Sequence, residues 1–136
     1  MASVAWEKCI AATAVHYVND LFADMDEYQS GTPATLSNFE TVAKHWSELK
    51  GFVMSLQFSP ASPFRDAAVT AVDLDDLKHI SMLLGDAPVL ADGSQMGVAP
   101  SGTADDAIYA YRGKLLEVRE TLQSAYGFSD ANTVAW

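Results

Sequence analysis

The chain has 136 residues, 49% of them hydrophobic, so it is long enough for one domain with a core and too apolar for a disordered chain. Its 18 acidic and 8 basic residues give a net charge of −10. The few Lys and Arg residues are scattered, which argues against nucleic acid as a partner, and the apolar runs are too short for a membrane span. We therefore expect a single domain over residues 1–136, either complete or one portion of a longer protein.

The first predicted element is a helix over residues 4–30. An apolar residue recurs there every three or four positions, the spacing that keeps one face of a helix apolar. Ser3 is its expected cap, and Gly31 and Pro33 its expected end. The stripe consists of Ala11, Ala14, Val18, Leu21, Met25 and Tyr28. Cys9 lies off this stripe and, as the only cysteine, excludes an intrachain disulfide.

The second predicted helix covers residues 38–58. Ser37 and Glu40 have the spacing of a capping box, and Pro60 stops the helix. Its apolar stripe consists of Phe39, Val42, Trp46, Leu49, Val53 and Leu56. A loop with a short turn of helix over residues 64–68 should follow.

The third predicted helix begins after its cap, Asp73, and ends at Gly85. We expect its inner face to consist of Leu74, Leu77, Ile80 and Leu84. The next segment, residues 86–102, is long for a connection without regular structure. Because it contains Val89 and Leu90, we expect it to be ordered and anchored by these two side chains.

The last long helix should begin after Thr103, with Asp106 completing its cap, and end at Tyr126. Its stripe consists of Ile108, Tyr111, Leu115, Val118, Leu122 and Ala125. A final turn over residues 129–136 places Trp136 at the terminus, and burial of that ring requires the tail to dock back on the helices.

Helices with one apolar face each must bury those faces against one another. The predicted fold is therefore all-α, an antiparallel four-helix bundle with a long ordered crossing loop before the last helix. The predicted centre of the core consists of Trp46, Leu49, Val53, Leu115, Val118 and Leu122. None of the three stripes contains a carboxylate, which argues against a di-iron site inside the bundle.

One local motif could bind a metal ion. His45 and Glu48 lie one turn apart on the second helix, so both side chains can reach the same cation. Two ligands do not hold a metal alone, so this site needs at least one acid from a neighbouring helix. In the alternative interpretation, His45 hydrogen-bonds at the edge of the bundle and Glu48 is solvated. The pairs His16 with Asp20 and Asp76 with His79 have similar spacings.

Several segments carry a resemblance to a known family: residues 44–52, 56–58, 83–90 and 125–128, followed by Asn132 and Trp136. Together they resemble an uncharacterised family of bacterial helical proteins of the imelysin-like group. The resemblance implies a peptidase-like or iron-associated protein that is exported or bound to the cell envelope. It also implies a Gly-x-His-x-x-Glu signature, in which His45 and Glu48 match the His and Glu while Ala43 stands at the Gly position.

The preferred functional interpretation is a non-catalytic binding module of imelysin-like type, associated with iron or another divalent cation at His45 and Glu48. A second interpretation is a peptidase-like hydrolase with a metal at the same two residues. A third is a structural or protein-interaction bundle without a small ligand. The expected partner is accordingly a cation or a protein. A periplasmic or envelope location follows from the resemblance if a signal segment has been removed.

Overall fold

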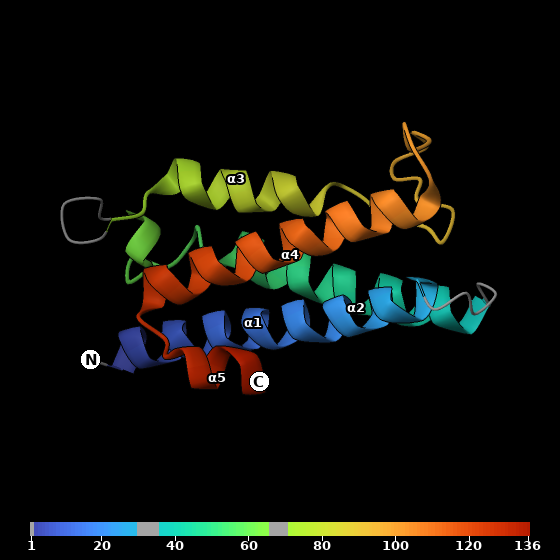
Figure 1. The fold of residues 1–136 in the computed structure, drawn as a ribbon. Helices are drawn as coiled ribbons and strands as arrows, with labels where there is room; N and C mark the ends of the chain where they lie inside the picture. The colour runs from blue at the N-terminus through green and yellow to red at the C-terminus, as the bar shows by residue number, and fades with distance from the viewer. Residues whose placement is uncertain (1, 30–35, 66–70) are drawn as a thin grey trace.

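The computed structural model describes residues 2–29, 36–65 and 71–136, and it is all-helical over these ranges (Figure 1). Its elements are α1 (Ala2–Gln29), α2 (Leu36–Ser55), a 3₁₀ turn η1 (Pro63–Arg65), α3 (Leu74–Leu84), α4 (Ala104–Tyr126) and α5 (Asp130–Ala135). The predicted all-α class is confirmed. No helix in the described ranges has both the length and the apolar content to cross a membrane.

The four longer helices pack as neighbours around a common core. α1 packs against α2 and α4, and α3 packs against the same two helices. Neighbouring helices run in opposite directions in Figure 1. All six stripe residues of α1 are buried, as are Val42, Leu49, Val53 and Leu56 of α2 and Ile108, Tyr111, Leu115, Val118 and Leu122 of α4. Phe39, Trp46 and Ala125 are partly buried.

The predicted boundaries of the first two helices are approximately correct, but α1 begins at Ala2, so Ser3 lies inside the helix rather than before it as a cap. α2 begins at Leu36, so Ser37 lies inside the helix rather than before it as a cap, and α2 ends at Ser55. Phe58 follows in a turn and is 74% exposed. The predicted end of α1 at Gly31 and Pro33 lies outside the described residues, as does most of the turn expected over residues 64–68.

The caps of α3 and α4 are confirmed. Asp73 and Asp76 form a capping box at the start of α3, and Thr103 and Asp106 form one at the start of α4. The inner face of α3 differs from the prediction because Leu74 is 44% exposed. As the first residue of the helix, it lines a surface groove between α2 and α3 together with other residues, including Met54 and Lys78.

The last carbonyl of α3 joins three parts of the chain. The Leu84 oxygen accepts hydrogen bonds from Trp46 Nε1 of α2 at 2.9 Å, from the Tyr111 hydroxyl of α4 at 3.1 Å and from Gln95 Nε2 at 3.0 Å. Carbonyls at a helix end lack partners within the helix, so these side chains satisfy the end of α3. This role keeps Trp46 at the rim of the core, where it is only partly buried.

A lysine of α2 completes this junction. Lys50 Nζ donates to the Ser81 oxygen at 2.7 Å and to the Gly85 oxygen at 2.8 Å, and lies 3.5 Å from Asp86 Oδ1. A cation at the C-terminal end of a helix also interacts favourably with the helix dipole. Lys50 therefore ties α2 to the end of α3 rather than contributing charge to the surface of α2.

The segment between α3 and α4 follows the prediction at one anchor only. Val89 is buried, whereas Leu90 is 40% exposed. Leu90 begins a tight turn, in which its oxygen accepts from Gly93 N and its N–H donates to the Ser94 oxygen, and this turn directs its side chain outward. The second anchor is polar instead: besides Leu84, Gln95 Nε2 binds the Ala87 oxygen at 2.7 Å.

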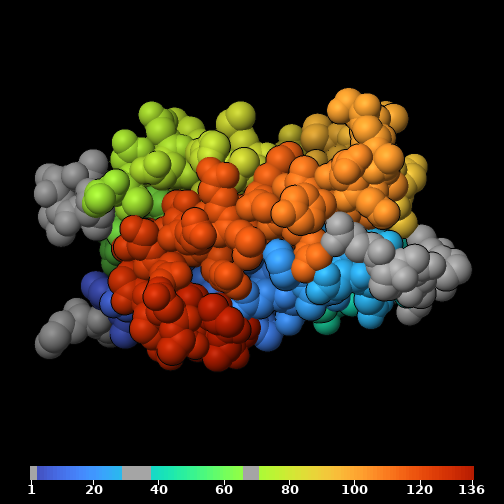
Figure 2. All heavy atoms as spheres, in the orientation of Figure 1, coloured from blue at the N-terminus to red at the C-terminus, as the bar shows by residue number. Residues whose placement is uncertain are grey.

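The tail docks as predicted. Figure 2 shows α5 lying directly against α1 and the end of α4. Trp136 packs edge-on against Phe128, with 4.9 Å between ring centroids. Asn19 of α1 fixes the end of the chain, because its Nδ2 donates to the Thr133 and Trp136 oxygens at 2.8 and 2.7 Å.

Candidate functional site

Four of the side chains singled out from the sequence, His16, Asp20, His45 and Glu48, belong to the two neighbouring helices α1 and α2. α2 contributes His45 from its middle, where Nδ1 lies 2.6 Å from Asp24 Oδ2 of α1. A carboxylate has only acceptor oxygens, so Nδ1–H is the donor of this bond. Nε2 on the other side of the ring lies 4.0 Å from Asp20 Oδ2, and that oxygen also pairs with His16 Nε2 at 3.2 Å. Two carboxylates of α1, those of Asp20 and Asp24, therefore lie beside His45.

Glu48 lies beside Tyr17 of α1, whose ring also packs against that of His45 with 6.0 Å between centroids. Burial and, next, the negative charge of Glu48 raise the pKa of the Tyr17 hydroxyl. The second oxygen of Glu48, Oε2, is buried and has no hydrogen-bond partner within the described part of the chain. The alternative expectation of a solvated Glu48 is therefore wrong at this atom.

Glu48 is not among the ion-pair partners of His45, which are Asp20 and Asp24 of α1. Across the described ranges, no group of three or more His, Cys, Asp or Glu side chains is placed to hold a metal ion. The residues that contact His45 form a chain of pairs, His16 to Asp20 and His45 to Asp24, and do not surround one point with Glu48. Metal binding at His45 and Glu48 stays a prediction.

A groove of about 330 Å³ lies beside Glu48. It is lined by Ile10 of α1 and by Ser47, Glu48, Gly51, Phe52 and Ser55 of α2. Gly51 leaves the groove open, because a Cβ atom there would have no neighbour within 4 Å. The Tyr17 ring stacks on Phe52, which lines the groove, with 5.7 Å between centroids.

Two exposed aromatic residues lie close along the chain to residues of this groove. Trp6 lies one turn before Ile10 on α1 and is 72% exposed, and Phe58 follows Ser55 and is 74% exposed. Because α1 and α2 run in opposite directions, both residues lie toward the same end of the groove. We use the name α1–α2 face for the surface that consists of the groove, these two aromatic residues, Tyr17 and the His–Asp pairs.

The α1–α2 face is acidic at its polar end. Asp20, Asp24 and Glu48 contribute carboxylates, whereas the nearby Lys50 is directed to the end of α3. The whole chain carries a net charge of −10, so the surrounding field has the same sign. This combination of an apolar groove and an acidic border favours a ligand that is both apolar and basic.

The remaining sequence pairs have structural partners elsewhere. His79 pairs with Glu117 of α4 rather than with Asp76, with 2.7 Å between His79 Nε2 and Glu117 Oε1. Asp76 instead accepts a hydrogen bond from the Asp73 N–H in the cap of α3. Cys9 is exposed. Neither place brings together the groups that a nucleophilic or metal site requires.

Sequence reasoning missed one buried carboxylate. Glu7 is 2% exposed and accepts a hydrogen bond from the Tyr126 hydroxyl at 2.8 Å. The stripe of α1 was traced from Ala11, yet one step of four residues back along it reaches Glu7. Continuing the three-to-four-residue period to the start of the helix would have found Glu7. The prediction that no apolar stripe carries a carboxylate is therefore wrong when the α1 stripe is extended to Glu7.

No family model, curated protein or solved structure matches this chain. The imelysin-like resemblance accordingly stays a prediction.

Proposed function

We propose that this chain is a non-catalytic binding module that docks a basic amphipathic helix of a partner protein on the α1–α2 face. The observation that carries the proposal is the Glu48 Oε2 atom, buried beside an apolar groove without a donor. An unsatisfied buried carboxylate oxygen is costly, so a partner that supplies a Lys or Arg donor there gains binding free energy.

The shape of the groove supports a helical occupant. Gly51 lets a partner approach the backbone of α2, while Ile10 and Phe52 offer apolar walls to one face of an amphipathic helix. Trp6 and Phe58 are large exposed aromatic residues, a type enriched where partners bind. The acidic residues along the face favour Lys and Arg on the partner and faster association at low salt.

The hydrolase alternative has less support than the binding module. It requires His45 and Glu48 to share a metal with a third ligand, and His45 is hydrogen-bonded to Asp24 while Glu48 is not among its ion-pair partners. Association with iron, like an envelope location, rests on the imelysin-like resemblance and is tested below through metal binding.

The docking proposal is tested with three synthetic helical peptides that share one apolar face and are basic, neutral or acidic on the other. Fluorescence anisotropy measures their affinities at low and high salt. We expect the basic peptide to bind most tightly, with an affinity that falls as salt rises. Equal affinities for all three peptides, or no binding of the basic one, would contradict the proposal.

Two matched glycine variants separate docking from folding. Gly51→Gln fills the groove, and Gly113→Gln places the same side chain on the exposed surface of α4; a Cβ atom meets nothing within 4 Å at either site. Both changes favour the helix. We expect Gly51→Gln to weaken binding of the basic peptide roughly tenfold or more, which corresponds to about 1.4 kcal/mol of binding free energy. Gly113→Gln should leave the affinity for the peptide unchanged. The reverse pattern would place the docking surface elsewhere.

A further inference from the structure

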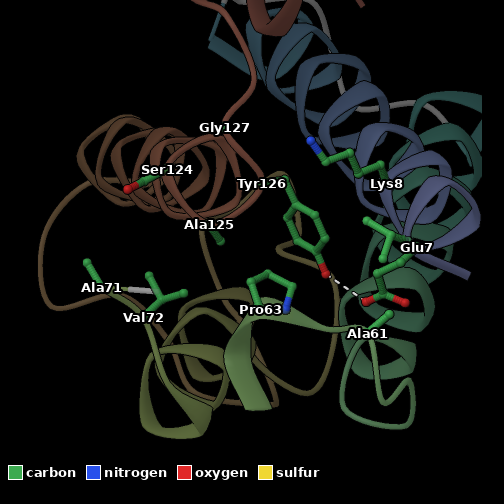
Figure 3. A pocket seen from close by; sticks show the side chains of 11 residues that line it. Glu7, Lys8, Ala61, Pro63, Ala71, Val72, Ser124, Ala125, Tyr126 and Gly127 are labelled. Carbon is green, nitrogen blue, oxygen red and sulfur yellow. Dashed lines mark hydrogen bonds between the residues drawn. The ribbon is translucent and has the colours of Figure 1, made fainter. Parts of the chain in front are cut away.

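A second cavity lies at the other side of α1, between its first turns and the end of α4 (Figure 3). Its volume is about 440 Å³, within the usual range of small-molecule sites. Val4, Ala61, Pro63, Val72 and Ala125 give it small apolar walls. Its polar side chains are Glu7, Lys8, Ser124 and Tyr126, and Figure 3 shows Glu7 and Tyr126 meeting beside it.

The Glu7 side chain is held in place by a tyrosine of α4. The Tyr126 hydroxyl donates to Oε1 at 2.8 Å, and the Tyr126 ring is itself fixed between Phe64, at 6.1 Å, and Phe128, at 5.7 Å. Burial, followed by the hydrogen bond to Glu7, raises the pKa of Tyr126 far above its ordinary value, so the hydroxyl keeps its proton and stays a donor.

No basic side chain compensates this charge within the described residues. Glu7 forms no ion pair there, and the Lys8 ammonium points away from the Glu7 carboxylate in Figure 3. Between the lining residues Ala61 and Pro63, Ser62 is 2% exposed, and its hydroxyl lies close enough to that of Tyr126 to act on the pKa of Tyr126. A buried carboxylate without a cationic partner is costly to the fold unless a ligand supplies one.

We propose that this cavity binds a small organic cation, an alkylammonium group with a short apolar body. The ammonium donates to the Glu7 carboxylate, and the apolar body lies against Val4, Val72 and Ala125. A neutral molecule of the same shape lacks the charge, and an anion is repelled. This site is separate from the α1–α2 face, so the inference does not depend on the proposed docking function.

The test uses butylammonium as the probe and butan-1-ol as its neutral counterpart, with binding followed by calorimetry and by amide chemical shifts. We expect saturable binding of butylammonium that shifts the resonances of Glu7, Tyr126 and Ala61, and no comparable shifts with the alcohol. Absence of saturation with butylammonium, or equal binding of the alcohol, would overturn the proposal. This comparison uses the unaltered protein and does not depend on any variant folding.

Glu7→Gln then removes the charge while keeping an acceptor for the Tyr126 hydroxyl. The matched control is Glu40→Gln, an exposed acid near the start of α2, at the opposite end of the molecule from the cavity. We expect Glu7→Gln to weaken the binding of butylammonium roughly tenfold or more, because a charge-assisted hydrogen bond is lost. Glu40→Gln should have no effect on this binding. Equal affinities of the two variants would show that Glu7 only ties α1 to α4, which would overturn the proposal.

Discussion

Replacing Lys50 by Met tests the junction at the end of α3. Met keeps much of the apolar stem of Lys50 but removes the ammonium that binds the Ser81 and Gly85 oxygens at 2.7 and 2.8 Å. The Lys50 side chain is only 14% exposed, so water replaces these bonds poorly. Hydrogen bonds to a charged group contribute about 1.5–3 kcal/mol, and a cation at a helix C-terminus about 0.3–1 kcal/mol. Because one ammonium makes both bonds, we expect a total loss of about 2–4 kcal/mol.

Urea denaturation followed by circular dichroism measures this loss as a change in the free energy of unfolding. The matched control is Lys44→Met, an exposed lysine on the same helix, which should change stability by less than about 0.5 kcal/mol. Similar values for the two variants would refute the reasoning, because Lys50 would then behave as an ordinary surface charge. A changed slope of the free energy of unfolding against urea concentration would instead indicate that the compactness of the folded or unfolded state has changed.

Three further predictions concern the core, the buried tyrosines and the metal hypothesis. Leu115→Ala should cost about 2–5 kcal/mol in thermal or urea unfolding because Leu115 is fully buried, and a loss below about 0.5 kcal/mol would contradict its place in the core. Burial raises the pKa values of Tyr111 and Tyr126 above the ordinary value of 10.0. The unfolded chain therefore releases these protons at lower pH than the folded chain, so their contribution to stability is complete below about pH 10 and declines as pH rises. The tyrosinate absorbance of the folded protein should rise at higher pH than that of the unfolded protein. Coincident titration curves would refute this. If iron or zinc binds at His45, saturating metal must raise the melting temperature of the unaltered protein and not of His45→Ala, whereas no rise in the unaltered protein would end the cation hypothesis.

The parts of the fold that depend on local sequence could be predicted. The caps of α3 and α4 are formed by residues three positions apart, Asp73 with Asp76 and Thr103 with Asp106, so neighbouring residues alone specify them. The stripes identified the buried face of each long helix because a helix presents every third or fourth residue to the same side.

Features that depend on contacts between distant segments could not be predicted in the same way. Leu74 and Leu90 are apolar residues in the correct period or segment, but the surface groove of α3 and the turn at Leu90 leave them exposed. The three donors at the Leu84 oxygen come from α2, α4 and the intervening loop. No local pattern encodes such a meeting point.

The candidate sites show the same division. The spacing of His45 and Glu48 placed them one turn apart on α2, but it could not indicate that Asp24 of α1 would bind the His45 ring. Glu7 was within reach of the sequence, since it continues the period of the α1 stripe. Its hydrogen bond to Tyr126, 119 residues away, required the fold.

The most direct test of the docking function is a map of amide chemical shifts in labelled protein titrated with the basic helical peptide. The account predicts shifts concentrated at Ile10, Tyr17, Gly51 and Phe52, together with the side-chain indole signal of Trp6. Shifts centred instead on the α2–α3 groove around Met54 and Leu74, or the absence of shifts at saturating peptide, would contradict docking on the α1–α2 face.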